Sequence, residues 1–129
     1  MIKLEDLKKN DVIYAVWYDK KYREVGMYSD IKVCKELCMI DTYPNPIEGV
    51  ICQGATEILT RSYEPYLFRT EKERDLEVKR IRQLIIDNFE NDDYLKNLIF
   101  TKATTGKRLN KYYEELFKDI LGIKEERTK

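Results

Sequence analysis

The chain of 129 residues is long enough for one compact domain with a sizeable core. Its 24 basic and 24 acidic residues balance, so no net charge attracts nucleic acid or an anionic membrane. Histidine is absent, which excludes Ser-His and Cys-His nucleophile pairs and every histidine-containing metal site. No apolar run approaches the roughly 20 residues of a membrane helix, so we expect no membrane partner.

The first residues and the cysteines indicate a cytoplasmic protein. The N-terminal sequence MIKLEDLKKND carries charges where a signal peptide has its apolar core. The odd number of cysteines fits reduced thiols. A zinc site built only from cysteine needs four thiolates, and this chain has Cys34, Cys38 and Cys52. We interpret all three as small buried residues of a sheet, and we expect no metal and no cofactor.

The chain opens with a short lead-in and a β-hairpin. Leu4 and Leu7 of the lead-in fit one helical turn that closes an open end of the β half. The next segment, Asp11–Asp19 (DVIYAVWYD), is rich in β-branched and aromatic residues on both faces, which predicts a central strand. Tyr22–Tyr28 returns as the second strand, and Gly26 within it predicts a bulge or a tight bend.

A second strand pair is predicted around a proline-rich loop. Ile31–Asp41 (IKVCKELCMID) fits one long strand bent near Lys35 and Glu36, or two short strands. Thr42–Gly49 (TYPNPIEG) is predicted to be a loop because it holds two prolines, an asparagine and a glycine.

Two further strand segments complete the β half. Val50–Thr60 has strand character, with a bulge predicted at Gly54, and Tyr63–Phe68 adds a last short strand. Short strands separated by turns at close spacing predict a small bent antiparallel sheet or an SH3-like barrel.

Three helices are predicted after the strands. Thr70–Phe89 begins with a capping box formed by Thr70 and Glu73, and its apolar residues recur at helical spacing. A short second helix is capped by Asn91–Asp93 and followed by a connector at Ala103–Gly106. The third helix, Leu109–Leu121, has an apolar residue at every step of three or four and a charged opposite face.

The fold class that follows is α+β in a single domain. We place the β half at about residues 11–68 and the helical half at about 70–122. Gly122 is predicted to stop the third helix, and residues 123–129 are predicted to be a frayed tail. If the β half leaves the third helix uncovered, its apolar stripe can pair with a second copy, so a homodimer is an open alternative.

Aromatic residues are the most unusual feature of the sequence. Ten tyrosines are many for this length, and a small barrel cannot bury all the aromatic rings of the first hairpin. Exposed aromatic groups are typical of protein interfaces. The predicted protein-binding residues are Tyr18, Tyr22, Tyr43, Tyr63 and Tyr66.

Basic residues concentrate on the predicted helices and offer an alternative function. Side by side, these helices would present one basic stripe to a phosphate backbone, as in a small nucleic-acid-binding module. Glu77, Asp87 and Glu90 lie close by in sequence, which is the ordinary mixture of a solvated surface. The residues of this alternative are Lys79, Arg80, Arg82, Lys102, Lys107, Arg108 and Lys111.

No arrangement of residues predicts catalysis. No pair of carboxylates stands out, and no catalytic residues are assigned. Thr104–Arg108 (TTGKR) resembles the end of a phosphate-binding loop, but Ala103 stands before it and Arg108 stands where Ser or Thr is required. We interpret it as a turn between helices. An enzyme of unusual type stays a third hypothesis, which a deep polar pocket with clustered carboxylates would support.

The run LKKNDVIYAVW, followed by FRTEKERDLEVKRIRQLI, resembles small, mostly uncharacterised proteins of phages and other mobile elements. In these proteins a compact SH3-like β-barrel precedes capped helices, and the resemblance covers about Leu4–Ile99. It implies a non-enzymatic accessory protein, and some members of this class block host defence or host enzymes. Our first hypothesis is therefore a non-catalytic, cytoplasmic binding protein, a phage-type inhibitor of a host protein.

Overall fold

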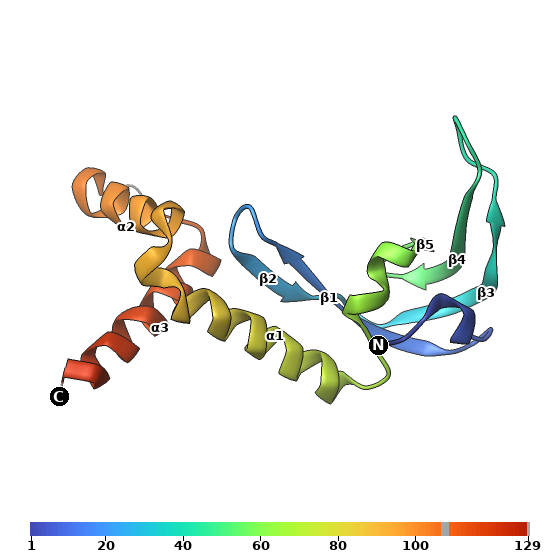
Figure 1. Cartoon of the computed structure of the whole chain (residues 1–129), viewed down its shortest axis with the longest axis horizontal. Helices are drawn as coiled ribbons and strands as arrows, with labels where there is room; N and C mark the ends of the chain where they lie inside the picture. Colours follow the sequence, from blue (N-terminus) through green and yellow to red (C-terminus); the bar gives the residue numbers. More distant parts are fainter. Residues whose placement is uncertain (107–108, 129) are drawn as a thin grey trace. The chain divides into compact units, whose positions relative to one another are not determined.

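The computed structural model describes residues 1–106 and 109–128, without the side chains of residues 103 and 123–128. Contacts divide the chain into two compact units. The first comprises Met1–Trp17 with Val25–Lys79, and the second comprises Tyr18–Glu24 with the chain from Arg80 onward. The elements in order (Figure 1) are η1 Leu4–Asp6, β1 Val12–Asp19, β2 Glu24–Met27, β3 Ile31–Ile40, β4 Ile47–Gly54, β5 Ile58–Leu59, η2 Arg61–Tyr66, β6 Leu67–Phe68, α1 Glu71–Asp87, η3 Phe89–Asn91, α2 Asp93–Thr105 and α3 Lys111–Thr128.

The strands form one small antiparallel sheet of six strands in the order β2-β1-β3-β4-β5, with β6 pairing β1. Together with the helices this confirms the α+β class. Within the described residues β2 and β5 end the path of the sheet without pairing to each other. The bent sheet is therefore confirmed, and the alternative of a closed SH3-like barrel is wrong.

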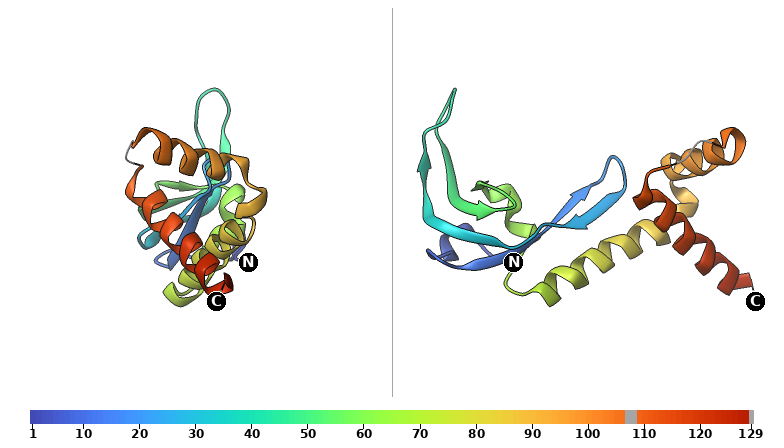
Figure 2. Two further views of the ribbon diagram at one scale, coloured as in Figure 1. Left: turned by 90° about the vertical axis from the view of Figure 1, so that its left-hand side faces the viewer. Right: turned by 180° about the vertical axis from the view of Figure 1, so that it is seen from behind.

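Two bulges bend the long hairpin of β3 and β4. The register shifts by one residue between Val33 and Lys35, and again between Lys35 and Cys38. Each shift adds an unpaired residue to β3, which bends the strand and increases its twist. Figure 2 shows β3 and β4 curving together. The prediction of a long strand bent near Lys35 is confirmed, whereas the predicted loop is shorter, because β4 already begins at Ile47.

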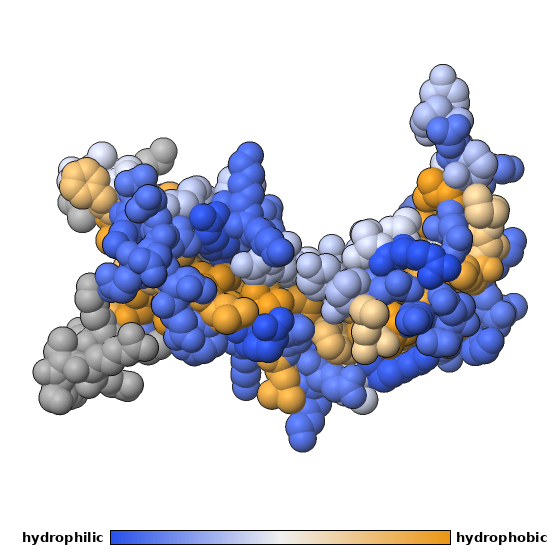
Figure 3. Space-filling view, viewed as in Figure 1, coloured by the Kyte–Doolittle hydropathy of each residue, from blue (hydrophilic) through white to orange (hydrophobic). Residues whose placement is uncertain are grey.

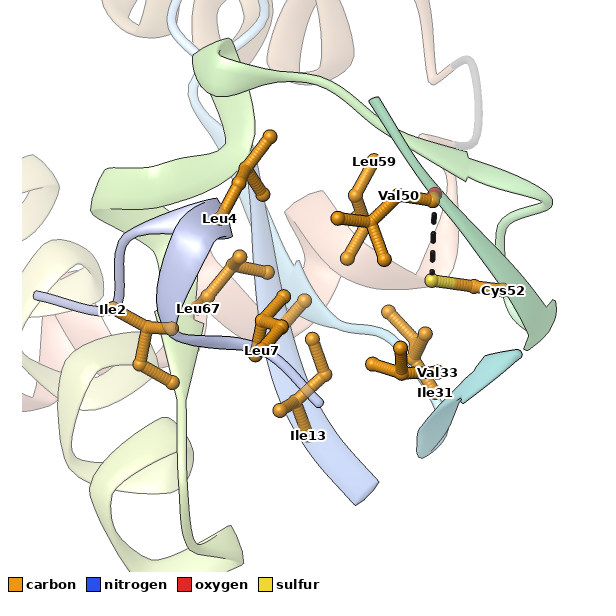
Figure 4. Packing of buried hydrophobic residues seen from close by; sticks show 11 residues of the cluster. Ile2, Leu4, Leu7, Ile13, Ile31, Val33, Val50, Cys52, Leu59 and Leu67 are labelled. Carbon is orange, nitrogen blue, oxygen red and sulfur yellow. Dashed lines mark hydrogen bonds between the residues drawn. The ribbon is translucent and has the colours of Figure 1, made fainter. Parts of the chain in front are cut away.

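One apolar core holds the first unit together (Figure 4). The predicted turn at Leu4 forms as η1, and both leucines of the lead-in are buried in this core. The backbone N–H of Leu4 donates a 2.8 Å hydrogen bond to the carboxylate of Glu64, which holds the lead-in in place. The cluster consists of Ile2, Leu4, Leu7, Ile13, Ala15, Ile31, Val33, Val50, Cys52, Leu59 and Leu67.

Two glycines of the sheet occupy positions where a side chain would not fit or would strain the backbone. A Cβ atom at Gly26 would lie 2.4 Å from Cζ2 of Trp17, so the glycine permits the indole to pack against β2. Gly54 pairs with Ile31 in regular register and has a φ of +122°, so it ends β4 in a conformation that favours glycine. The bulge predicted at Gly54 is therefore wrong, because the extra residues lie in β3.

The first turn of α1 begins as predicted. The backbone N–H of Glu73 donates a 3.2 Å hydrogen bond to the hydroxyl of Thr70, which confirms that Thr70 caps the helix. Arg74 then packs on the sheet, with its guanidinium 5.4 Å from the centre of the Tyr14 ring. Its Nη1 donates a 3.2 Å hydrogen bond to the carbonyl of Tyr28. These contacts fix the start of α1 within the first unit.

Two short predictions before and after α1 need correction. Most of the strand predicted at Tyr63–Phe68 is the 3-10 helix η2, and only Leu67–Phe68 is strand. Pro65 has no backbone N–H to donate to a ladder, which explains why the strand is so short. The helix α1 ends at Asp87, before the predicted end at Phe89, and Phe89 instead begins η3.

In the second unit, α2 and α3 extend beyond their predicted ends. Asp92 caps α2 by accepting a 3.2 Å hydrogen bond from the backbone N–H of Leu95. The helix continues to Thr105, so most of the predicted connector is helical, and Gly106 with a φ of +67° ends it. The stop predicted at Gly122 is also wrong, because α3 continues to Thr128.

Candidate functional site

The outer part of the β3–β4 hairpin is the most exposed apolar part of the first unit. We define the arm as Leu37–Gly49. Its strands are paired by Cys38 with Gly49, Met39 with Glu48 and Ile40 with Ile47. Figure 3 shows hydrophobic residues gathered on this hairpin, at the right of the view.

The two faces of the arm differ in their surroundings. On one face, Leu37 packs against the core of the first unit, and Val50, which follows the arm, is a member of that core. On the opposite face Gly49 is flanked by isoleucines, since an added Cβ would lie 3.0 Å from Cγ2 of Ile58 and 3.3 Å from Cδ1 of Ile40. Residues paired across an antiparallel ladder share a face. That outward face therefore carries Cys38, Ile40, Ile47, Ile51 and Ile58.

The tip of the arm presents an aromatic ring to solvent. Tyr43 is 98% exposed, and Met39 in the adjoining strand is 64% exposed. The hydroxyl of Thr42 donates a 2.5 Å hydrogen bond to the carbonyl of Asn45 and so orders the loop. The prolines on either side of Asn45 restrict the backbone further. A restricted loop loses little entropy when a partner binds it.

Acidic residues dominate the arm and the segment that follows it. Between Glu36 and Thr60 the sequence holds four carboxylates and no lysine or arginine. Asp41 and Glu57 are exposed and have no side-chain partner within the described part of the chain. An exposed apolar surface with acidic residues beside it suits a partner with apolar and basic groups.

Arg61 is the nearest base to the arm, and carboxylates outnumber it. Its Nη1 lies 2.9 Å from Oε2 of Glu5 and 3.5 Å from Oε2 of Glu64, and its Nη2 contacts Glu48. The hydrogen bonds that Arg61 donates to Glu5 and Glu48 raise the pKa of its guanidinium. Because one guanidinium faces three carboxylates, this group keeps a negative net charge.

The structure separates the five predicted protein-binding tyrosines. Tyr43 is at the tip of the arm. Tyr63 packs against the core of the first unit, and Tyr66 is half-buried at the end of η2. Tyr18 and Tyr22 belong to the second unit, and Tyr18 is half-buried there. Of the three predicted binding tyrosines in the first unit, Tyr43 is therefore the one presented to solvent.

Tyr22 and its neighbour Arg23 are engaged inside the second unit. The ring of Tyr22 makes an edge-to-face contact with Tyr94, with the ring centres 6.3 Å apart. The guanidinium of Arg23 lies over the Tyr94 ring, and its Nε is 2.9 Å from Oδ2 of Asp92. The carbonyl of Tyr22 accepts a 2.6 Å hydrogen bond from the Tyr113 hydroxyl. Tyr22 thus helps to hold the unit together.

Carboxylates bind most of the predicted nucleic-acid-binding residues that can be placed. Arg82 pairs with Asp119 at 2.5 Å, and Lys111 lies 3.9 Å from Glu115. Lys102 contacts Glu114, and this ammonium holds the pKa of the Glu114 carboxyl below its usual range. Three of the predicted basic residues are therefore already paired with carboxylates of the chain.

The other residues of that set cannot be grouped with these three within the described part of one unit. Lys79 belongs to the first unit, whereas Arg80 belongs to the second. Lys107 and Arg108 lie outside the described residues. A hollow of about 540 Å³ is lined by Lys102, Leu109, Lys111 and Glu114, which are the paired groups and one leucine.

Sequence reasoning missed most of the arm. Met39 and Ile47 were assigned to a strand and a loop, although both are exposed. The available signal was the apolar run Leu37–Ile40, which is apolar on both faces of a strand and has no lysine or proline to protect an edge.

The described side chains offer no group of three or more Cys, Asp or Glu residues that could hold a metal ion. In the described parts of the chain, no helix is both long and apolar enough to cross a membrane. Neither a protein-family model nor a curated protein matches the chain, and no solved structure matches it either.

Proposed function

We propose that this protein is a non-catalytic binding protein that contacts a partner protein through the arm. The observation that carries the proposal is the ordered, solvent-exposed tip with Tyr43, which continues into the exposed Met39 and Ile47. Exposed apolar groups of this kind stabilise an interface when a partner removes them from water.

The proposal extends to the class of protein. Cys34, Cys38 and Cys52 carry free thiols, which fits the reducing cytoplasm. The resemblance to accessory proteins of phages and mobile elements supports an inhibitor of a host protein, including a defence protein. An inhibitor of this kind acts by occupying a surface of its target, which requires an exposed recognition element and no catalytic group.

The test is affinity capture from a bacterial lysate with the tagged full-length protein, followed by mass spectrometry. The double substitution Met39→Ser with Tyr43→Ser removes two exposed apolar side chains from the arm. Phe100→Ser is the matched control, since Phe100 is an exposed apolar side chain of α2. We expect a specific partner that the control variant retains and the arm variant loses. Equal capture by both variants would contradict the assignment of the arm.

Nuclease treatment of the lysate tests the alternative of nucleic-acid binding. Binding to a phosphate backbone would disappear with nuclease and would fall steeply with salt concentration. The ion pairs of Arg82 and Lys102 give this alternative less support than the arm gives to a protein partner. Capture that depends on nucleic acid would make the basic residues the next positions to substitute.

A further inference from the structure

The free backbone edge of the arm indicates how a partner binds. The pairs between β1 and β3 involve Val12–Ile13 and Ile31–Lys32, and the last backbone bonds along this edge join Val33 to the lead-in. The carboxylate of Glu36 accepts a 3.4 Å hydrogen bond from the N–H of Lys9. Beyond this point, within the described residues, β3 pairs with β4 alone.

The hydrogen-bond pattern shows which groups this edge offers. Cys52 donates its backbone N–H to Glu57, on the β5 side of β4, at 2.8 Å. Backbone N–H and C=O groups alternate in direction from one residue to the next along a strand. Glu48 lies four residues before Cys52, so its N–H and C=O also point to the β5 side, away from β3. Met39 is opposite Glu48 in the ladder and therefore directs its N–H and C=O to the outer edge of β3.

From Cys38 onward, after the second bulge of β3, this edge has few of the features that protect an edge strand. Natural sheets protect such edges with lysine, proline or a covering element. Leu37–Asp41 (LCMID) contains neither lysine nor proline. An unprotected edge with apolar side chains is a template for an additional strand from another chain.

The charges around this edge determine which strand fits. Glu36 and Asp41 stand at its two ends, and Lys35 is the last base before them. A second copy pairing antiparallel with Met39 opposite Met39 would place Asp41 of each copy opposite Leu37 of the other and one residue from its Glu36. Carboxylates of both copies would then gather at each end of the pairing, where like charges repel. A strand with apolar and basic residues in alternation avoids this repulsion.

We propose that the outer edge of β3 at Leu37–Asp41 binds an extended segment of the partner protein as an added strand. The segment alternates apolar side chains with lysine or arginine. Its backbone pairs with Met39, and a basic side chain faces Asp41. This inference rests on the proposed function and specifies the chemistry of the partner.

The test uses a library of short random peptides, selected for binding to the full-length protein. We expect the enriched peptides to be basic and to alternate in polarity, and we expect Asp41→Lys to remove the preference for basic residues. Met39→Pro deletes the outward N–H and leaves the bonds between β3 and β4 intact. It should weaken the binding of an enriched peptide roughly tenfold or more relative to Met39→Thr, which loses the same side chain but keeps the N–H.

Thermal unfolding and circular dichroism of both variants are the controls that check whether the fold is retained. Three results would each overturn the proposal. The first is binding that Met39→Pro leaves unchanged, the second is enrichment of acidic or helix-forming peptides, and the third is no enrichment above that obtained with the Met39→Pro protein. A dimer in sedimentation that Met39→Pro dissociates would also overturn it, since the occupant would then be a second copy. Lysate capture that needs Tyr43 and tolerates Met39→Pro would retain the proposed function and exclude strand addition.

Discussion

The hydroxyl of Tyr113 donates a 2.6 Å hydrogen bond to the backbone carbonyl of Tyr22, which lies 91 residues earlier in the chain. Tyr112 makes the same kind of bond, at 2.8 Å, to the carbonyl of Arg23. Two neighbouring tyrosines of α3 therefore hold the end of the first hairpin by its backbone. Because the acceptors are carbonyl groups, the side chains of the hairpin give no signal of this contact in the sequence.

The substitution Tyr113→Phe removes this donor and keeps the ring. Tyr113 is buried, so the carbonyl of Tyr22 loses its partner, and burial raises the pKa of the Tyr113 hydroxyl. We expect the free energy of unfolding to fall by about 1–2 kcal/mol in urea titrations. Tyr43→Phe is the control. Tyr43 is exposed, so removal of its hydroxyl should leave the free energy of unfolding unchanged. Equal stability of the two variants would contradict a structural role for this bond.

The close approach of Gly26 and Trp17 predicts a cost for any larger residue. A Cβ at Gly26 would lie 2.4 Å from the indole, so Gly26→Ala should lower the free energy of unfolding by about 1–3 kcal/mol. In a Trp17→Leu background the same substitution should cost less, which a double-mutant cycle measures. Gly122→Ala is the matched control, since nothing lies within 4 Å of its added Cβ and the residue is helical. It should stabilise the protein by up to about 1 kcal/mol.

The positive φ of Asn10 predicts different outcomes for two small substitutions. Its φ is +75°, and its N–H donates a 2.8 Å hydrogen bond to Val33. Asn10→Ala should lower the free energy of unfolding by about 1 kcal/mol, because asparagine tolerates this region better than alanine. Asn10→Gly should be close to neutral. Thermal unfolding of both variants decides the point, and equal midpoints would exclude backbone strain as the cause.

Burial of the Cys52 thiol predicts a loss of stability at alkaline pH. Desolvation raises its pKa from 9.0 to about 11, with a smaller effect of Cys34. Above pH 9 the unfolded chain releases the proton while the folded protein retains it, so deprotonation favours the unfolded state. The free energy of unfolding should therefore fall as the pH rises from about 9 to about 11, by about 2–3 kcal/mol.

The variant Cys52→Ala isolates this thiol from the tyrosines that also ionise at high pH. Urea titrations at several pH values should give a shallower alkaline loss for Cys52→Ala than for the wild type. Cys34→Ala is the matched control and should retain most of the slope. Parallel pH profiles for wild type and Cys52→Ala would show that the thiol does not control the alkaline stability.

Local patterns predicted most of the individual elements. The hydroxyl of Thr70 caps α1 and Asp92 caps α2, since capping depends on residues a few positions apart. The apolar spacing of the third helix is confirmed by the burial of Tyr113, Leu116, Phe117 and Ile120. The ends of the helices were less predictable, because a glycine such as Gly122 is tolerated inside a helix.

Contacts between residues far apart in the chain could not be predicted from the sequence. The one-residue shifts of β3 depend on how it pairs with β4, so the bend was predicted near Lys35 without its cause. Tyr43 and Tyr63 were both predicted as binding residues from the excess of aromatic residues, yet Tyr43 is exposed and Tyr63 packs against the core. Composition cannot distinguish these two tyrosines, because the difference lies in what the folded sheet places beside each ring.

The exposed loop around Tyr43 has a consequence for how the protein can evolve. The side chains of the loop lie outside the buried cluster, so selection for folding places little restriction on them. If the arm binds a partner as proposed, change at these positions alters the binding surface and leaves the scaffold intact. A protein with this arrangement can follow a rapidly diverging target, one substitution at a time, without passing through unfolded intermediates.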